Sequence, residues 1–193
     1  LLYGREKFWD IVNAHRVEDG KELLFAAAAD DAHYYSPEQI NLRAGLGHAW
    51  VMVHCPGEFS VDNLIGAMQR GDYYPSCGVV FESIEFSRGR LKVKIKAEPG
   101  QQYRIRFVSS KRGFSRKMEW LDLRNDPPRP PRMVPLYDAQ IGAVAAEFNG
   151  VEAQYCMEKD DLYVRAVAVS DQVTTCRSMQ FPAFQSAWTQ PYC

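Results

Sequence analysis

The chain lacks several features that would place it directly in a broad class of protein. No apolar run approaches the ~20 residues needed to span a bilayer, so no transmembrane helix is predicted. The formal net charge is only -1, which argues against electrostatically driven binding to the nucleic-acid backbone. The five cysteines form no Cys-x-x-Cys pair, a pattern that fits neither a zinc ribbon nor a small disulfide-rich domain. What remains is a chain of 193 residues, 46% hydrophobic, long enough for two small domains.

Familiar catalytic motifs are also absent from the sequence. There is no Gly-x-Ser-x-Gly elbow, no phosphate-binding loop and no dinucleotide-binding fingerprint. Histidine is scarce, with four in the chain, and His15, His48 and His54 stand alone without another histidine at metal-binding spacing. We interpret these three as structural, which leaves His33 as the histidine of chemical interest.

The sequence is organised around residues 25–33, which read FAAAADDAH. Small uncharged residues ahead of the two acids predict a strand buried on both faces, as in a parallel sheet covered by helices. Active sites of such folds lie at the carboxyl ends of the strands. Asp31 and His33 are two residues apart, so on an extended backbone both side chains project to the same face. A carboxylate and an imidazole directed at one point predict half of a metal site.

The same residues have a simpler interpretation. Asp30 or Asp31 can cap the segment that follows, and the pair would then belong to a solvated turn. If the metal site is real, Tyr34 and Tyr35 follow it directly and are candidates for contact with the substrate.

Three further stretches accompany the Asp-x-His pair in a fixed order, namely 8–12 (FWDIV), 47–53 (GHAWVMV) and 65–78 (IGAMQRGDYYPSCG). Together they resemble the C-terminal part of the PHP (polymerase and histidinol phosphatase) metallohydrolases, in particular the carbaryl-hydrolase-like branch. The resemblance covers most of the chain. It implies that Asp31 and His33 are metal ligands and that a β/α barrel continues into a β-rich domain.

The chain also departs from the PHP pattern. Cys77 stands where the family has Thr or a similar small polar residue, and Val79 stands where Pro is common. The His-x-His near the start of PHP enzymes, and the further His and Glu that follow it, are absent. The sequence begins at Leu1 rather than at Met. We therefore expect this chain to be the C-terminal portion of a longer protein whose other metal ligands lie upstream.

Residues 1–78 are expected to form an α/β unit, the C-terminal part of a PHP-type β/α barrel. Apolar spacing predicts a helix over 4–15 whose buried face carries Phe8, Ile11, Val12 and His15. A strand is predicted at 50–54. Ser60 suits the N-cap of a helix over 61–69, and Gly71 is well placed to end it.

Residues 79–193 are expected to form an all-β, sandwich-like domain. Polar and apolar residues alternate over 91–97 and 103–107, which predicts strands with one buried and one solvated face. A further strand is expected at 161–170 and a last strand or a terminal tail at 184–191, with a long proline-rich loop at 111–135 and a short helix at 138–148. Such short strands favour an antiparallel β-sandwich.

These observations lead to a functional hypothesis and two alternatives. The first is a metal-dependent hydrolase of phosphoester, carboxyl-ester or carbamate substrates; divalent Zn, Mn or Fe would lower the pKa of bound water towards ~7. Its partners would be a small ester and the missing N-terminal part of the protein. The second is a β-sandwich binding or assembly module, with the visible chain catalytically incomplete. The third, a nucleic-acid binder, is disfavoured because the basic residues alternate along solvated strand faces. These are Lys92, Lys94, Lys96, Arg104 and Arg106.

Overall fold

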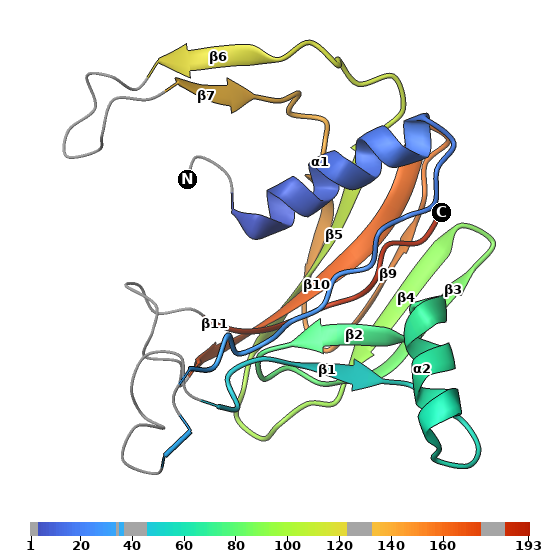
Figure 1. Ribbon diagram of the computed structural model, residues 1–193, viewed down its shortest axis with the longest axis vertical. Coiled ribbons are helices and arrows are strands. Elements are labelled where there is room, and N and C mark those ends of the chain that lie inside the picture. The colour runs from blue at the N-terminus through green and yellow to red at the C-terminus, as the bar shows by residue number, and fades with distance from the viewer. Residues whose placement is uncertain (1–3, 34, 37–45, 123–132, 175–183) are drawn as a thin grey trace.

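The computed structural model describes residues 4–33, 35–36, 46–122, 133–174 and 184–193. Within these residues the chain forms two helices and eleven strands (Figure 1). The helices are α1 (Arg5–Glu18) and α2 (Val61–Arg70). The strands are β1 (Trp50–Val53), β2 (Tyr73–Ser76), β3 (Phe81–Ser87), β4 (Arg90–Ile95), β5 (Tyr103–Lys111), β6 (Glu119–Asp122), β7 (Met133–Leu136), β8 (Ala143–Asn149), β9 (Glu152–Cys156), β10 (Asp161–Val173) and β11 (Phe184–Trp188).

The largest sheet has six strands in the order β1-β2-β11-β10-β5-β8. Its centre is the long antiparallel pair β5 and β10, whose register runs from Tyr103 opposite Ser170 to Lys111 opposite Asp161. Tyr103, Ile105 and Phe107 are buried along β5, whereas Arg104 is exposed. The strand and the inward face predicted from the alternation at 103–107 are therefore confirmed.

A second sheet, β3-β4-β9, packs on one face of the large sheet and closes the main core. The side chains of Leu91, Val93 and Ile95 on β4 are almost completely buried in this core. They belong to the same apolar cluster as Phe107 on β5 and Val164 on β10. The inner faces of the two sheets thus form a two-layer sandwich, in which alternating apolar residues provide the driving force for packing.

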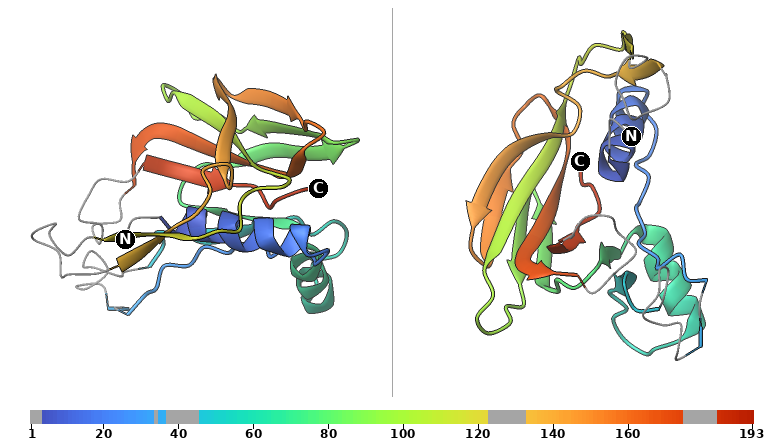
Figure 2. Two further views of the ribbon diagram at one scale, coloured as in Figure 1. Left: turned by 90° about the horizontal axis from the view of Figure 1, so that it is seen from above. Right: turned by 90° about the vertical axis from the view of Figure 1, so that its left-hand side faces the viewer.

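Helix α1 covers the opposite face of the large sheet, as the two views of Figure 2 show. Ile11 and Ala14 of the helix lie in a second apolar cluster with residues of β10 and of the loops at 114 and 141. The predicted helix is confirmed, but its predicted face is rotated. Phe8 and Val12 are 41% and 42% exposed, whereas the polar residues Asp10 and Asn13 are buried.

Helix α2 begins and ends as its sequence predicts. The Ser60 hydroxyl accepts a hydrogen bond from the backbone N–H of Asn63, which satisfies one of the free donors at the helix start. Gly71 closes the last turn with φ of 78°, a left-handed conformation that suits glycine. The helix leads directly into β2 and the large sheet.

The expectation of a PHP-type β/α barrel is wrong for this structure. Every strand pairing that the structure describes is antiparallel, and the described residues contain only two helices beside the strands. Residues 25–29, predicted to be a buried parallel strand, run as an extended segment outside any sheet. An uncharged run shows that a segment tolerates burial, but it does not show which neighbours are present to cover it.

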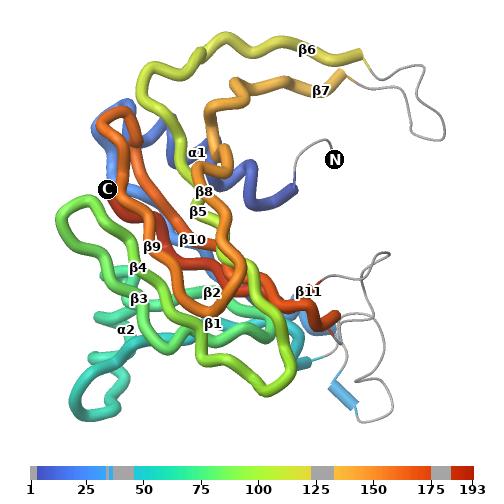
Figure 3. The backbone as a smooth tube through the Cα atoms, turned by 180° about the vertical axis from the view of Figure 1, so that it is seen from behind, coloured from blue at the N-terminus to red at the C-terminus, as the bar shows by residue number. Residues whose placement is uncertain are grey.

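The predicted helix over 138–148 is also wrong, because this region contains β8. Its apolar residues at 141, 144, 145 and 148 have helical spacing, but β8 pairs with β5 from Ala143 opposite Ser109 to Asn149 opposite Arg104. Pairing at the sheet edge therefore outweighs a weak local periodicity. The expected loop over 111–135 is partly replaced by the hairpin of β6 and β7, which projects from the two sheets (Figure 3).

The predicted division into domains at residues 78 and 79 stays a prediction. Strands β1 and β2, which precede it, share one sheet with four strands that follow it. Neither described helix combines the length and apolar character required to cross a membrane.

Candidate functional site

Asp31 and His33 lie on an exposed turn at the end of the extended segment that follows α1. The turn arises at Asp31, whose φ of 54° is left-handed and unusual for a residue other than glycine. The Nδ1 atom of His33 lies 2.5 Å from the backbone carbonyl oxygen of Asp31. A carbonyl oxygen only accepts, so Nδ1 donates the proton and Nε2 of a neutral ring keeps its lone pair.

The observed backbone at Asp31 differs from the extended strand that the sequence predicted for Asp31 and His33. Because Asp31 is left-handed rather than extended, strand alternation does not place the two side chains on one face. The turn instead links the imidazole of His33 to the backbone of Asp31. The assignment of the pair as metal ligands stays a prediction.

The two tyrosines proposed to contact substrate follow His33 directly in the sequence. Tyr34 lies outside the described residues. Tyr35 is 67% exposed, and its hydroxyl donates to the carbonyl oxygen of Ala32 at 2.8 Å, which orders the turn locally. Its role in substrate binding also stays a prediction.

Asp30, the residue before the turn, has a clear structural role. Its carboxylate accepts hydrogen bonds from the backbone N–H groups of Gly47, His48 and Ala49 at 2.8, 2.6 and 2.6 Å. Burial raises the pKa of the Asp30 carboxyl, but these three donors favour the charged form more strongly, so the net pKa lies below its ordinary value. Asp30 therefore fixes the start of the turn to the chain that enters β1.

The remaining histidines do not join the turn in a larger ligand cluster. Among the residues that the structure describes, no group of three or more His, Cys, Asp or Glu side chains is placed to bind a metal ion. His15 meets Phe114 edge to face with ring centroids 4.9 Å apart, in agreement with a structural role. Both ring nitrogens of His48 are buried and have no hydrogen-bond partner in the described part of the chain.

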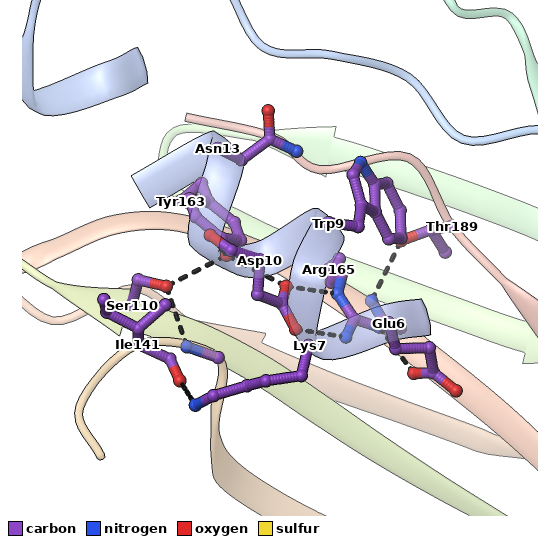
Figure 4. Close-up of polar contacts among 12 residues, drawn as sticks. Glu6, Lys7, Trp9, Asp10, Asn13, Ser110, Ile141, Tyr163, Arg165 and Thr189 are labelled. Atoms are coloured by element: carbon purple, nitrogen blue, oxygen red, sulfur yellow. Dashed lines mark hydrogen bonds and ion pairs between the residues drawn. The ribbon is translucent and has the colours of Figure 1, made fainter. Parts of the chain in front are cut away.

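A buried polar network that the sequence did not predict joins α1 to the large sheet (Figure 4). The guanidinium of Arg165 on β10 donates from Nε and Nη2 to the two carboxylate oxygens of Asp10 at 2.8 and 2.7 Å. The Tyr163 hydroxyl donates to Asp10 at 2.9 Å and accepts from the hydroxyl of Ser110, also at 2.9 Å. Trp9 covers the guanidinium at 5.0 Å from its ring centroid.

The electrostatics of this network indicate a structural clamp. Burial, followed by the charge of Asp10, raises the pKa of the Tyr163 hydroxyl far above its ordinary value, so this hydroxyl stays protonated. Burial lowers the pKa of Lys7, whose ammonium group donates to the carbonyl oxygen of Ile141. A cavity of 260 Å³ adjoins these residues. Arg165 lines this cavity, but its guanidinium is already paired with Asp10, so its charge is not free to bind a ligand. No sequence signal distinguished Asp10 and Arg165 from polar residues on solvated faces.

A cavity of 880 Å³ lies between β3, the end of α2 and the last four residues. Its walls are rich in aromatic rings. Phe86 and Tyr192 stack with their ring centroids 5.0 Å apart, and Phe25 meets Tyr73 edge to face at 6.4 Å. Burial raises the pKa of the Tyr73 and Tyr192 hydroxyls, so both stay neutral hydrogen-bonding groups.

Comparisons of the chain with protein-family models, with curated proteins and with solved structures found no match.

Proposed function

We propose that this chain contributes two metal ligands, Asp31 and His33, to a metal-dependent hydrolase. The observation that carries the proposal is the contact between His33 Nδ1 and the carbonyl oxygen of Asp31. Histidines that bind metals commonly donate one ring N–H to a backbone carbonyl, which fixes the tautomer and orients the other nitrogen. The left-handed backbone at Asp31 supports the proposal, because strained residues cluster at functional sites.

The donor set fits half of a metal centre. The imidazole nitrogen and the carboxylate are both ligands accepted by Zn, Mn and Fe. Catalytic zinc sites take three protein ligands, so at least one ligand must come from outside the described residues. When bound, a divalent metal would make water acidic enough to serve as a nucleophile near neutral pH. In this proposal, the Asp30 carboxylate holds the turn in place by accepting hydrogen bonds from three backbone N–H groups.

The proposed substrates are phosphoesters, carboxyl esters or carbamates. The support for this class is the resemblance of the Asp-x-His and its flanking stretches to PHP metallohydrolases. The proposed partner is the N-terminal part of a longer protein, which would complete the ligand set. No nucleic-acid partner is proposed. Each basic residue on the solvated strand surfaces for which the structure describes an ion pair has a glutamate as its partner. Lys92, for example, lies 2.6 Å from Glu152.

Elemental analysis tests this proposal together with hydrolysis of p-nitrophenyl phosphate and p-nitrophenyl acetate. Asp31→Ala and His33→Ala should lose bound metal relative to the unmodified chain and lose any metal-dependent turnover with it. His54→Ala is the matched control, because His54 is exposed and lies outside the turn. Equal metal content in all four proteins would refute the assignment.

A second candidate function, that of a binding module, is favoured by the aromatic cavity of 880 Å³. Ligand sites are commonly concave, mostly apolar and furnished with a few polar groups, and this cavity has rings beside two neutral tyrosine hydroxyls. A small planar aromatic molecule such as indole should bind there. Tyr192→Ala should weaken indole binding, whereas Phe59→Ala, which alters a ring that is 81% exposed and outside the cavity, should not. Equal binding by both variants would exclude this cavity.

A further inference from the structure

The extended segment 22–29 is hydrogen-bonded along one of its two edges. The carbonyl oxygen of Glu22 accepts from the Arg16 side chain at 2.6 Å. The amide side chain of Asn13 bonds both backbone groups of Leu24, at 2.8 Å to its N–H and 3.1 Å to its C=O. Every bonded residue is an even-numbered position.

Two residues further along, the pattern repeats with a different partner. The side-chain amide of Gln190 accepts from the N–H of Ala26 at 2.9 Å and donates to its C=O at 2.8 Å. Two amide side chains thus bond the segment as a neighbouring strand would, one at Leu24 and one at Ala26. In an extended chain, successive residues direct their backbone groups to opposite edges.

The other edge is formed by the odd-numbered residues. In the described part of the chain, no hydrogen bond reaches the backbone N–H or C=O of Phe25 or Ala27. Both residues are exposed, Phe25 by 39%. Figure 2 shows the segment between α1 and α2, on the side of the molecule opposite the three-stranded sheet. Residues 23–29 carry no charge that would repel an approaching strand.

We propose that the outer edge of residues 23–29 accepts an added β-strand from another polypeptide. The occupant we infer is an extended, uncharged and apolar peptide, because backbone pairing supplies its hydrogen bonds and an uncharged edge favours an uncharged partner. The inner bonds hold the segment extended before the partner arrives, which reduces the entropy lost on pairing. This inference rests on backbone hydrogen bonding alone and does not require metal at Asp31 and His33.

The test uses the 193-residue protein and a peptide that copies residues 23–29, flanked by lysines for solubility. Backbone amide exchange is followed by NMR with and without the peptide. In the free protein, Leu24 and Ala26 should exchange slowly and Phe25 and Ala27 rapidly. Added peptide should slow exchange at Phe25 and Ala27 at least tenfold and leave Leu24 and Ala26 unchanged.

Two proline variants make a matched pair. Ala27→Pro removes an N–H of the outer edge, and Ala28→Pro removes one that points inward and has no described partner. Ala27→Pro should abolish peptide binding and Ala28→Pro should retain it. A peptide N-methylated at every amide leaves the protein unaltered and should also fail to bind.

The result that overturns the proposal is an exchange rate at Phe25 and Ala27 that millimolar peptide does not change. Equal binding by the two proline variants would overturn it as well. A dimer of the protein that Ala27→Pro abolishes and Ala28→Pro retains would show that a second copy fills the edge, and would overturn the choice of an external peptide.

Discussion

Arg165 and Asp10 form a two-bond ion pair across the interface between β10 and α1, with side chains only 2% and 3% exposed. The pair connects the helical layer to the sheet at a point where neither charge reaches water. A buried ion pair offsets its own desolvation only when its geometry is good, so its main effect is to specify which face of α1 meets the sheet. This accounts for the rotated face of α1, because Asp10 must point inward.

Asp10→Ala should destabilise the protein by about 3–5 kcal/mol, because it leaves the buried guanidinium of Arg165 with only the half-exposed carboxylate of Glu6, at 3.3 Å, as its counter-charge. The free energy of unfolding from urea titration measures this loss. Asp72→Ala is the control, since it removes one partner of the exposed pair with Arg70 and should cost only about 0–1 kcal/mol. If both variants cost the same, the pair is not buried in solution.

Gly142→Ala should be far more damaging than Gly113→Ala. Both glycines have positive φ, 57° and 74°, so both changes carry the backbone cost of about 1–2 kcal/mol. Only at Gly142 would the new methyl group lie 2.5 Å from the Asp10 carboxylate, whereas nothing lies within 4 Å at Gly113. Thermal unfolding compares them, and equal losses would contradict the packing of this loop against α1.

The contribution of Asp30 to stability should depend on pH. Its folded-state pKa is depressed, so the stabilisation is complete above the unfolded pKa of about 3.9 and is lost as the pH falls through the lower folded value. Asp30→Ala should cost about 1–3 kcal/mol near pH 7, because three N–H groups lose a charged acceptor. Urea unfolding from pH 7 to pH 2 should show this difference shrink below pH 4. A difference that stays constant, or one matched by the exposed control Asp62→Ala, would contradict the role of Asp30.

The basic strand face should tolerate loss of its charge. Lys92 and Lys94 pair with glutamates at 2.6 and 2.9 Å, but their side chains are 40% exposed, and solvent-screened pairs of this kind add little to stability. The variant with Lys92, Lys94 and Lys96 replaced by Gln should melt within a few degrees of the unmodified protein. A DNA or RNA complex that weakens steeply with salt and disappears in this variant would instead identify a polyanion site.

Local signals in the sequence were sufficient where a residue's own chemistry decides the structure. Ser60 and Gly71 marked the two ends of α2 because a cap and a left-handed C-terminal glycine act within one turn. The alternation over 103–107 predicted β5 and its buried face because one side of the strand meets the core. Both are properties of short stretches of chain.

The predictions from the sequence failed where residues far away in the chain determine the local structure. The alanines of 25–29 fit a buried strand, but their structure depends on Asn13 and Gln190, which the run itself does not reveal. For the candidate site, the sequence identified Asp31 and His33 but not the left-handed turn that links them. The role of Asp30 was foreseen only as one alternative, a cap for the following chain. Asp10 and Arg165 were missed because burial of a charge depends on its partner across the interface.

Mn²⁺ titration followed by NMR tests the proposed metal site most directly, because paramagnetic broadening locates even a weakly bound ion. The resonances of Asp31 and His33 should broaden first, and His33→Ala should abolish this broadening whereas His54→Ala leaves it intact. Broadening that begins at another acidic cluster, such as Glu158 and Asp160, would contradict the proposal that Asp31 and His33 are metal ligands.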